Sequence, residues 1–452
     1  MKKLTSKKKL LLYGCSGLGV NMLNLIVGTY LCSALLTGGF GAEDIGVYTY
    51  SNRNLVIAGI WSVLILAVKI MDGVIDIPMS SFTDNLRTRW GRRRPALVIG
   101  FVPMIVAYLL FLFPLTSGES IWNTIWFGVL LGVFYCFYTL TMLTFYATFA
   151  EVAATEQDMV FLSNVKSVCD VIYFILGYAL LPVFIGMDIN IRWVALIFLP
   201  LSLTMLIPLF LLKERSTRKG DEGSENFEPV KRISLIEALG GSIKNKSFVY
   251  WMTTAAVMNI GLQLFLSGIN ELFSTTGLNQ TVIMASAFAP VPFTILLYNK
   301  IVKRFGLGYA YRYILSIFSV GMIIMYICLQ ISDKVPLGVL TGIALFAGLL
   351  VSFSIGAFFS VSYTVPSHLA AKEKEKSGRS VSSMYFAVQG LFEGVASGLA
   401  SGVILVNLKS HDCIEWMPLI AAASCMVAFG MSLVFPKVVS QMGRTDKKTA
   451  AE

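Results

Sequence analysis

Three charged residues, Lys69, Asp72 and Asp76, lie inside an apolar stretch that runs from residue 54 to residue 82. Their spacing of i, i+3 and i+7 places them on one face of a helix. Two carboxylates one turn apart can bind a small cation through hard oxygen atoms, or can share a proton. We therefore expect Asp72 and Asp76 to bind Na⁺ or H⁺, with Lys69 compensating their charge. A simpler alternative is a structural Lys69–Asp72 ion pair, which leaves Asp76 unexplained.

The depth of these charges in the apolar stretch supports a functional role. Asp72 lies twelve residues before Asp84, which ends the stretch. A helix rises 1.5 Å per residue, so Asp72 lies about 18 Å from that end, near the middle of a ~30 Å hydrocarbon layer. A charge that faces lipid costs roughly 2.5–3.5 kcal/mol. The three side chains must therefore point into the protein.

The composition indicates an integral membrane protein. Hydrophobic residues make up 56% of the 452 residues and charged residues only 14%, against about 25% in soluble domains. The mean hydropathy is +0.73. Segments long enough to span a bilayer are expected at 10–36, 54–82, 96–115, 122–150, 162–186, 192–212, 248–272, 280–302, 311–330, 336–365, 380–407 and 413–435.

The basic residues are concentrated on one side of these segments. They precede the first segment, follow the second, eighth and tenth, and fill the middle stretch and the tail. The positive-inside rule places both termini and the middle loop in the cytoplasm of a multi-pass plasma-membrane protein. The same distribution explains the net charge of +10 without nucleic acid as a partner.

The chain divides into two halves with one design. The polar stretch 213–247 separates an N-terminal bundle, 1–212, from a C-terminal bundle, 248–437, and 438–452 is a cytoplasmic tail. After the second segment of each half comes a similar loop, "DNLRTRWG" at 84–91 and "NKIVKRFG" at 299–306. We expect an all-α membrane protein with twelve transmembrane helices in two pseudo-symmetric six-helix bundles, which is the major facilitator fold.

Further polar residues within the apolar segments indicate a cavity for a hydroxyl-rich solute. Asparagine and glutamine offer both donors and acceptors, and aromatic rings offer an apolar face. Each such residue alone could instead hold helices together. Lys166 and Asp170, at i and i+4, are expected to form an internal, charge-compensating ion pair. The expected substrate-binding residues are Asn21, Tyr146, Asn259, Gln263, Gln389 and Glu393.

Four stretches of the chain resemble the glycoside–pentoside–hexuronide:cation symporter family, of which the melibiose permease is a member. The most specific is "KIMDGVIDIPMSSFTDNLRTRWGRRRP" at 69–95, which is similar to the family's Asp-x-x-x-Asp-Pro pattern and Trp-Gly-Arg loop, with one residue, Ile77, inserted before Pro78. The others are "LYGCSGLGVN" at 12–21, "YTLTMLTFYATFAEVA" at 138–153 and "KEKEKSGRSVSSMYFAVQGLFEG" at 372–394. The resemblance implies a major facilitator with Asp72 and Asp76 as cation ligands.

The same resemblance implies that the basic loop after residue 82 gates the transporter. Any cytoplasmic loop is basic, so its composition alone is no evidence of gating. In major facilitators this loop pairs with neighbouring helix ends and sets the balance between inward and outward states. The gating residues expected here are Asp84, Arg87, Arg89, Gly91, Arg92 and Arg93.

The substrate side departs from the family pattern. Galactoside-binding members carry an aspartate where Asn21 stands and another on the fourth helix near Thr141. They keep an arginine near Lys166, and a lysine where the present chain has Glu393. The cation pair is thus present while the residues on the substrate side differ, so the solute need not be a galactoside, and the ion need not be Na⁺.

The leading hypothesis is cation-coupled symport of a sugar or glycoside by a monomer in the lipid bilayer, without cofactor. An alternative is a related facilitator that carries a lipid, peptide or other amphiphile without ion coupling. Helices rich in aromatic residues and methionine would tolerate such a solute. An enzyme is not expected, since no nucleophile–base or metal motif is present and the two histidines, His368 and His411, lie at opposite faces. A nucleotide-binding loop is also absent from the sequence.

Overall fold

The computed structural model describes residues 3–4, 6–37, 54–187, 189–214, 216–218, 240, 243–272, 278–377 and 382–444. These residues contain twelve helical stretches that are long and apolar enough to cross a membrane. The predicted number of spans and the all-helical class are therefore confirmed. The described residues form no β-strand, and one isolated β-bridge joins Leu4 and Ala153. Most of the predicted middle loop and the end of the tail lie outside these residues.

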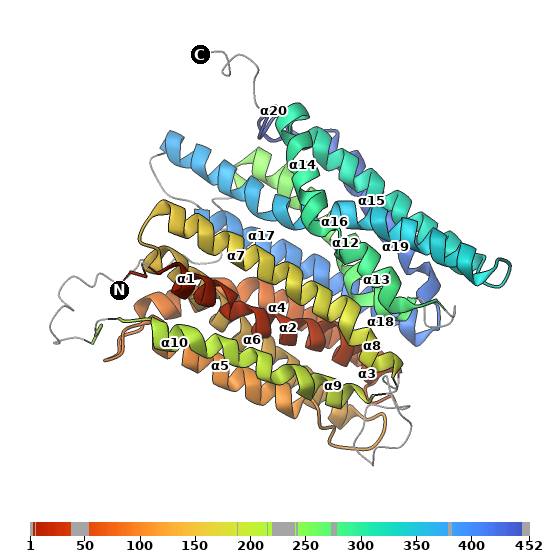
Figure 1. Ribbon diagram of the computed structural model, residues 1–452, viewed down its shortest axis with the longest axis horizontal. Coiled ribbons are helices and arrows are strands. Elements are labelled where there is room, and N and C mark those ends of the chain that lie inside the picture. The colour runs from red at the N-terminus through yellow and green to blue at the C-terminus, as the bar shows by residue number, and fades with distance from the viewer. Residues whose placement is uncertain are drawn as a thin grey trace. The chain divides into compact units, whose positions relative to one another are not determined.

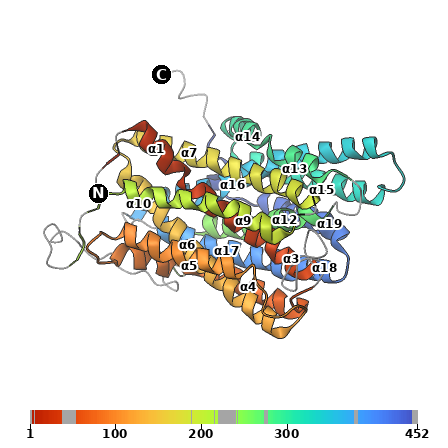
Figure 2. The same cartoon turned by 60° about the horizontal axis from the view of Figure 1, so that its bottom comes forward.

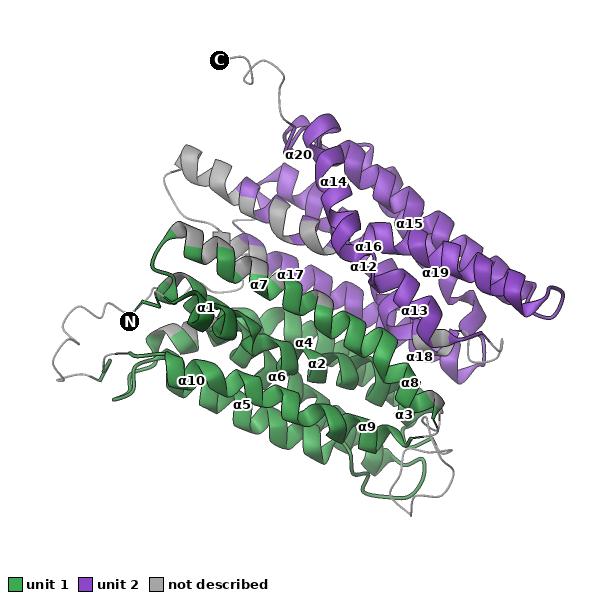
Figure 3. Ribbon diagram, viewed as in Figure 1, with its two compact units in different colours: residues 1–233 green, residues 234–452 purple. Residues whose placement is uncertain are grey.

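The chain divides into two compact units, Met1–Ile233 (unit 1) and Ser234–Glu452 (unit 2) (Figure 3). In unit 1 the helices lie side by side along a common direction (Figures 1 and 2). The first span consists of α1 (Lys7–Gly14), η1 (Cys15–Gly17), α2 (Leu18–Leu25), η2 (Ile26–Leu31) and α3 (Cys32–Thr37). It is followed by α4 (Ala58–Asn85), α5 (Arg93–Leu110), α6 (Ile121–Val152), α7 (Glu156–Ile175), η3 (Leu176–Leu180), α8 (Leu181–Gly186), α9 (Ile191–Phe198), η4 (Leu199–Leu206) and α10 (Ile207–Leu211).

Unit 2 repeats the helical plan. Its helices are α12 (Lys246–Leu272), α13 (Gln280–Phe288), α14 (Val291–Phe305), α15 (Leu307–Gln330), α16 (Leu337–Ser377), α17 (Ser382–Gly398), η5 (Leu399–Ile404), α18 (Leu405–Ser410), η6 (Ile414–Trp416), α19 (Met417–Ser432) and α20 (Lys437–Ser440). Within the apolar layer every backbone N–H and C=O needs a partner, and the helix supplies one inside each segment.

Several helices run beyond the predicted apolar segments. Helix α4 ends at Asn85 rather than at residue 82, and α16 ends at Ser377 rather than at residue 365. The apolar part of α16 itself ends at Phe358. Hydropathy marks where a segment meets lipid, whereas helical hydrogen bonding continues into water until a cap or loop ends it. The predicted apolar segments therefore locate the spans but do not give the ends of the helices.

Three of the spans contain a π-helical turn, η2, η3 and η5. A π turn widens a helix locally and disturbs its regular hydrogen bonds. Two of these turns contact each other in unit 1, where the Tyr30 hydroxyl of η2 donates to the Gly177 carbonyl of η3 at 2.6 Å. This bond joins the first and fifth spans within the apolar layer, next to the polar residues described below.

Candidate functional site

The charged face of α4 packs against α6. Thr139 donates from its hydroxyl to Oδ1 of Asp72 at 2.9 Å, and Lys69 Nζ lies 3.9 Å from the centroid of the Tyr135 ring. Tyr135 and Thr139 are i and i+4 on α6, so they form one face of that helix. Lys69 and Asp72 are not joined by an ion pair within 4 Å, because the lysine lies on the aromatic ring instead. The structure thus does not contain the simpler alternative, a Lys69–Asp72 ion pair.

Asp76 lies one turn further along α4 and is half-buried. Its carboxylate has no hydrogen-bond donor among the residues that the structure describes. Two residues later, Pro78 stands inside the helix. Proline has no N–H, so it cannot donate to the Val74 carbonyl one turn before it. This part of α4 therefore offers carboxylate and carbonyl oxygens that are not occupied by the usual donors.

A second polar cluster joins α2, α6 and α7 of unit 1. Lys166 Nζ and Asp170 Oδ2 are 2.6 Å apart, which confirms the predicted i,i+4 ion pair. Asp170 Oδ1 accepts from Asn21 Nδ2 at 3.4 Å, and Asn21 Oδ1 accepts from the Tyr138 hydroxyl at 3.0 Å. Lys166 Nζ lies 5.2 Å from the centroid of the Tyr146 ring. Four predicted residues on three helices are thereby connected, and Tyr138 completes the cluster.

Removing one partner of the Lys166–Asp170 pair should destabilise the protein. The two side chains are 32% and 24% exposed, so each charge is largely withdrawn from water. We expect Asp170→Asn to lower the free energy of unfolding by about 1–3 kcal/mol, because the lysine loses its charged acceptor. Combining it with Lys166→Met should restore part of that loss. Thermal unfolding in detergent is the measurement, and Lys334→Met, at an exposed position, is the control. Equal stability of wild type and Asp170→Asn would contradict this.

The predicted residues of unit 2 form a separate network around the amide of Gln389. Its Nε2 donates to Glu393 Oε1 and to the Ser362 carbonyl, each at 2.7 Å. Its Oε1 accepts from Trp251 Nε1 at 3.3 Å. Asn259 Nδ2 donates to the backbone carbonyl of Glu393 at 3.0 Å.

Gln263, the remaining predicted residue, is half-buried and does not hydrogen-bond to any other described side chain. The structure therefore connects three of the four candidates predicted in unit 2 and leaves Gln263 outside the network.

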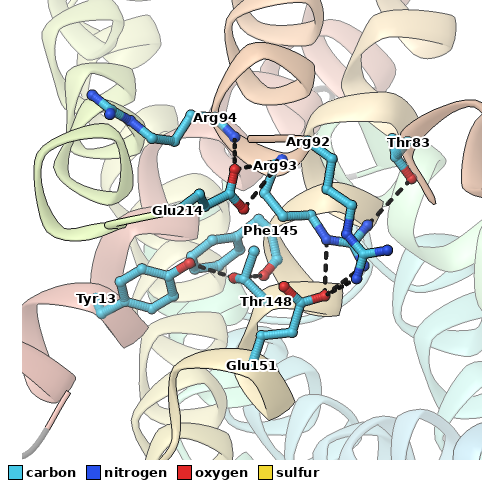
Figure 4. Close-up of polar contacts among 9 residues, drawn as sticks. All are labelled: Tyr13, Thr83, Arg92, Arg93, Arg94, Phe145, Thr148, Glu151 and Glu214. Carbon is cyan, nitrogen blue, oxygen red and sulfur yellow. Dashed lines mark hydrogen bonds and ion pairs between the residues drawn. The ribbon is translucent and has the colours of Figure 1, made fainter. Parts of the chain in front are cut away.

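The α4–α5 loop carries the predicted gating residues, and its arginines meet an acidic residue that the sequence did not single out. Arg93 is buried, and its Nη2 lies 2.7 Å from Oε1 of Glu151 at the end of α6. Arg92 Nη2 lies 3.1 Å from the same oxygen (Figure 4). Arg87 and Arg89 are exposed instead. The side chain of Asp84 lies outside the described part of the structure.

The first residues after α10 pack on the same loop. Glu214 accepts backbone N–H bonds from Arg93 at 3.0 Å and from Arg94 at 3.4 Å, at the N-terminus of α5 (Figure 4). Thr217 donates its N–H to the Thr88 carbonyl and accepts from the Thr88 N–H, both at 3.0 Å. Glu214 thus satisfies amides that a helix start leaves unpaired. The sequence predicts Glu214 in the polar middle loop, 213–247, without a partner.

Gly91 turns this loop through a backbone conformation with φ of +89°, and Gly306 has φ of +88° in the loop between α14 and α15. The predicted similarity of the two loops therefore extends to their backbone. In unit 2 the residues after the last span pack on the loop, since Leu307 donates its N–H to the Met442 carbonyl at 2.9 Å. Each unit thus closes with a segment that packs on its own loop.

Burial raises the pKa of the Glu214 carboxyl, although the N–H bonds from Arg93 and Arg94 act in the opposite direction. Because its pKa is raised in the folded state, this group favours the folded state at low pH and loses that contribution as pH rises through its folded pKa. The ionised form remains the better acceptor for the amides of α5.

A model of the "MFS/sugar transport protein" family matches residues 12–435. The chain belongs to this family. The family's proteins are membrane transporters of the major facilitator type, so the chain is a transporter and not an enzyme. The predicted resemblance to a family of major facilitators is confirmed.

Among curated proteins, this transporter is similar to the lactose permease of Lactobacillus helveticus. The two are 30% identical over 119 residues, which are 25% of this chain and 18% of the permease. The match thus spans less than a fifth of that relative.

Solved major facilitators share the fold at low sequence identity. The nucleoside transporter NupG is 16% identical and superposes with a TM-score of 0.65 over 96% of this chain and 100% of NupG. A bacterial homologue of the iron transporter ferroportin, in an inward-facing state, is 14% identical, with a TM-score of 0.60 over 95% of this chain and 98% of that chain.

Two residues with contacts to the candidate site, Thr139 and Glu151, were not predicted as site residues from the sequence. Thr139 is one of many hydroxyl residues on α6, and only its position opposite Asp72 distinguishes it. Glu151 stands at the C-terminal end of the same helix. Its distance of 58 residues from Arg93 hides the pairing.

Proposed function

We propose that this transporter is a secondary symporter that couples uptake of a sugar or glycoside to a cation, Na⁺ or H⁺, by alternating access in the plasma membrane. The proposal of cation coupling is supported by the composition of one face of α4. It buries two carboxylates one turn apart, and Lys69 lies on Tyr135 rather than in an ion pair with either of them.

Binding of a cation would change the charge of this face. The ionised pair holds up to two negative charges within the apolar layer, and such charge is costly there. Carboxylate oxygens of Asp72 and Asp76 suit a hard cation, and each can also take a proton. A ligand drives a conformational change only through its different affinity for the two states. We therefore assign the coupling to occupancy of this pair.

The proposed solute contacts come from two polar networks, one in each unit. In unit 1, Asn21, Tyr138 and the Lys166–Asp170 pair offer donors and acceptors that match sugar hydroxyls, beside the half-exposed ring of Tyr146. In unit 2, Asn259, Gln263, Gln389 and Glu393 are the proposed contacts. The family description and the name of the lactose permease support a carbohydrate solute.

The proposed orientation places both termini and the middle loop in the cytoplasm, from the distribution of basic residues. Insertion of an epitope tag within residues 216–228 tests this directly. Antibody should reach the tag only after the cells are permeabilised, and labelling of intact cells would contradict the orientation.

The test of function is uptake of radiolabelled sugars and glycosides by vesicles that contain the purified protein, without ATP. A Na⁺ gradient and a pH gradient are imposed separately, and protein-free vesicles serve as the control. We expect one sugar to accumulate above its external concentration under one of the two gradients. Equilibration without accumulation would instead support an uncoupled facilitator, and transport of amphiphiles but no sugar would contradict the carbohydrate assignment.

A further inference from the structure

The carboxyl of Glu393, like that of Asp76, is a membrane carboxyl that pairs with no cation among the residues that the structure describes. It lies on α17 within the span Val388–Ser410. Asp170 pairs with Lys166, and Asp72 lies near Lys69. Among the residues that the structure describes, the carboxyl of Glu393 contacts the amide of Gln389 and the hydroxyl of Ser362, and both of these groups are neutral. An ionised carboxylate without a cation in the apolar layer is costly, whereas a protonated one is not.

The surroundings of Glu393 from the other helices are neutral. Helix α12 contributes Trp251 and Asn259, and α16 contributes the carbonyl and the hydroxyl of Ser362. Tyr311 of α15 lies within electrostatic range of Glu393, and Tyr298 of α14 and Cys425 of α19 lie within range of Tyr311. Tyr311 donates its hydroxyl to Met258 Sδ at 3.2 Å. None of these groups carries a charge at neutral pH.

The basic residues of unit 2 have other positions. Among those that the structure describes, Arg312 donates through Nε to the Gly308 carbonyl at the start of α15, and Lys409 stands at the far end of the Val388–Ser410 span. Lys300, Lys303 and Arg304 lie in the last turns of α14. Among the described residues of unit 2, charge compensation of Glu393 therefore has to come from a proton.

The amide of Gln389 holds a fixed orientation next to this carboxyl. The indole N–H of Trp251 can only donate, and the carbonyl of Ser362 can only accept. Gln389 must therefore turn its oxygen towards Trp251 and its NH₂ group towards Ser362 and Glu393. Glu393 Oε1 always receives a hydrogen bond, so a proton on this carboxyl resides on Oε2. The same orientation of Gln389 fits the ionised and the protonated form of Glu393, so Gln389 does not have to move when the proton binds.

We propose that Glu393 is a proton-binding site of unit 2, separate from the Asp72/Asp76 pair of unit 1. The carboxylate Oε2 takes up a proton from water and releases it again, with no other bond formed or broken. This goes beyond the proposed function, which requires only the pair on α4, and it stands even if that pair binds Na⁺ alone.

Infrared difference spectroscopy of the full-length protein in lipid tests this without any solute. The carbonyl stretching band of a protonated carboxylic acid is followed while the pH is stepped, in a background that carries Asp72→Asn and Asp76→Asn. We expect a band that appears on acidification above the ordinary Glu pKa of about 4.3. Glu393→Gln should remove that band, and Glu119→Gln, at an exposed position, should keep it.

A second measurement counts protons. A pH-sensitive dye should report one proton fewer taken up per protein by Glu393→Gln than by Glu119→Gln over the same pH step. If Glu393→Gln does not reconstitute, Glu393→Asp keeps a carboxyl and should shift the band. The proposal is overturned if the background protein shows no such band, or if the band and proton uptake are unchanged in Glu393→Gln and unmoved in Glu393→Asp.

Discussion

Vesicles that contain the Asp76→Asn variant are expected to equilibrate the solute across the membrane but not to accumulate it. The substitution keeps the shape of the side chain and removes its charge. Asp76 has no hydrogen-bond donor among the described residues, so the change should leave the packing of α4 against α6 intact. The polar clusters around Lys166 and Gln389 are also untouched. Coupling should therefore be lost while downhill movement survives.

Asp72→Asn is expected to give the same loss of accumulation. Its Oδ1 still accepts the hydroxyl of Thr139, and Lys69 remains on the ring of Tyr135, so the protein should fold normally. The measurement compares concentrative uptake with equilibration in the same vesicles, with Na⁺ and pH gradients imposed one at a time. Glu119→Gln, which removes an exposed carboxylate, is the matched control. Full accumulation in both variants would refute the cation site on α4.

The sequence predicted the fold well because the bilayer imposes a simple rule. Each span needs about 20 apolar residues, and the backbone inside it must be helical. The twelve spans therefore followed from hydropathy. The i,i+4 pair of Lys166 and Asp170 was also predictable, because both residues lie on one helix and local geometry decides their contact.

Contacts between helices could not be predicted in the same way. The sequence paired Lys69 with Asp72 as one alternative, because both are on α4, but Tyr135 of α6 offers its ring to the lysine. Glu214 was assigned to the polar middle loop, although it accepts the amides of Arg93 and Arg94 across more than one hundred residues of chain. Such pairings depend on which helices are neighbours, and a single sequence does not contain that information.

Substitution of Gly91 by alanine is expected to displace Glu214 from the N-terminus of α5. Gly91 has φ of +89°, a conformation that costs an L-residue roughly 1–2 kcal/mol. A Cβ atom there would also lie 2.1 Å from Oε2 and 2.4 Å from Cβ of Glu214. The carboxylate cannot keep its position, so the amides of Arg93 and Arg94 lose their acceptor. Both effects act on the same loop and should add.

Hydrogen exchange of the α4–α5 loop, followed by mass spectrometry, measures this displacement. We expect exchange at the start of α5 to become at least about tenfold faster in Gly91→Ala, since about 1.4 kcal/mol corresponds to a factor of ten. Gly59→Ala is the control, because a Cβ at Gly59 meets nothing within 4 Å.

A Gly91→Ala, Glu214→Ala double variant separates the two causes. Glu214→Ala alone should also speed exchange, because it removes the acceptor without adding strain. If the clash with Glu214 dominates, the double variant should exchange no faster than Glu214→Ala. If the backbone conformation dominates, the double variant should be faster than either single variant. Unchanged exchange in Gly91→Ala would show that Glu214 does not hold the loop, and the matching role of Met442 at Gly306 would then lose its support as well.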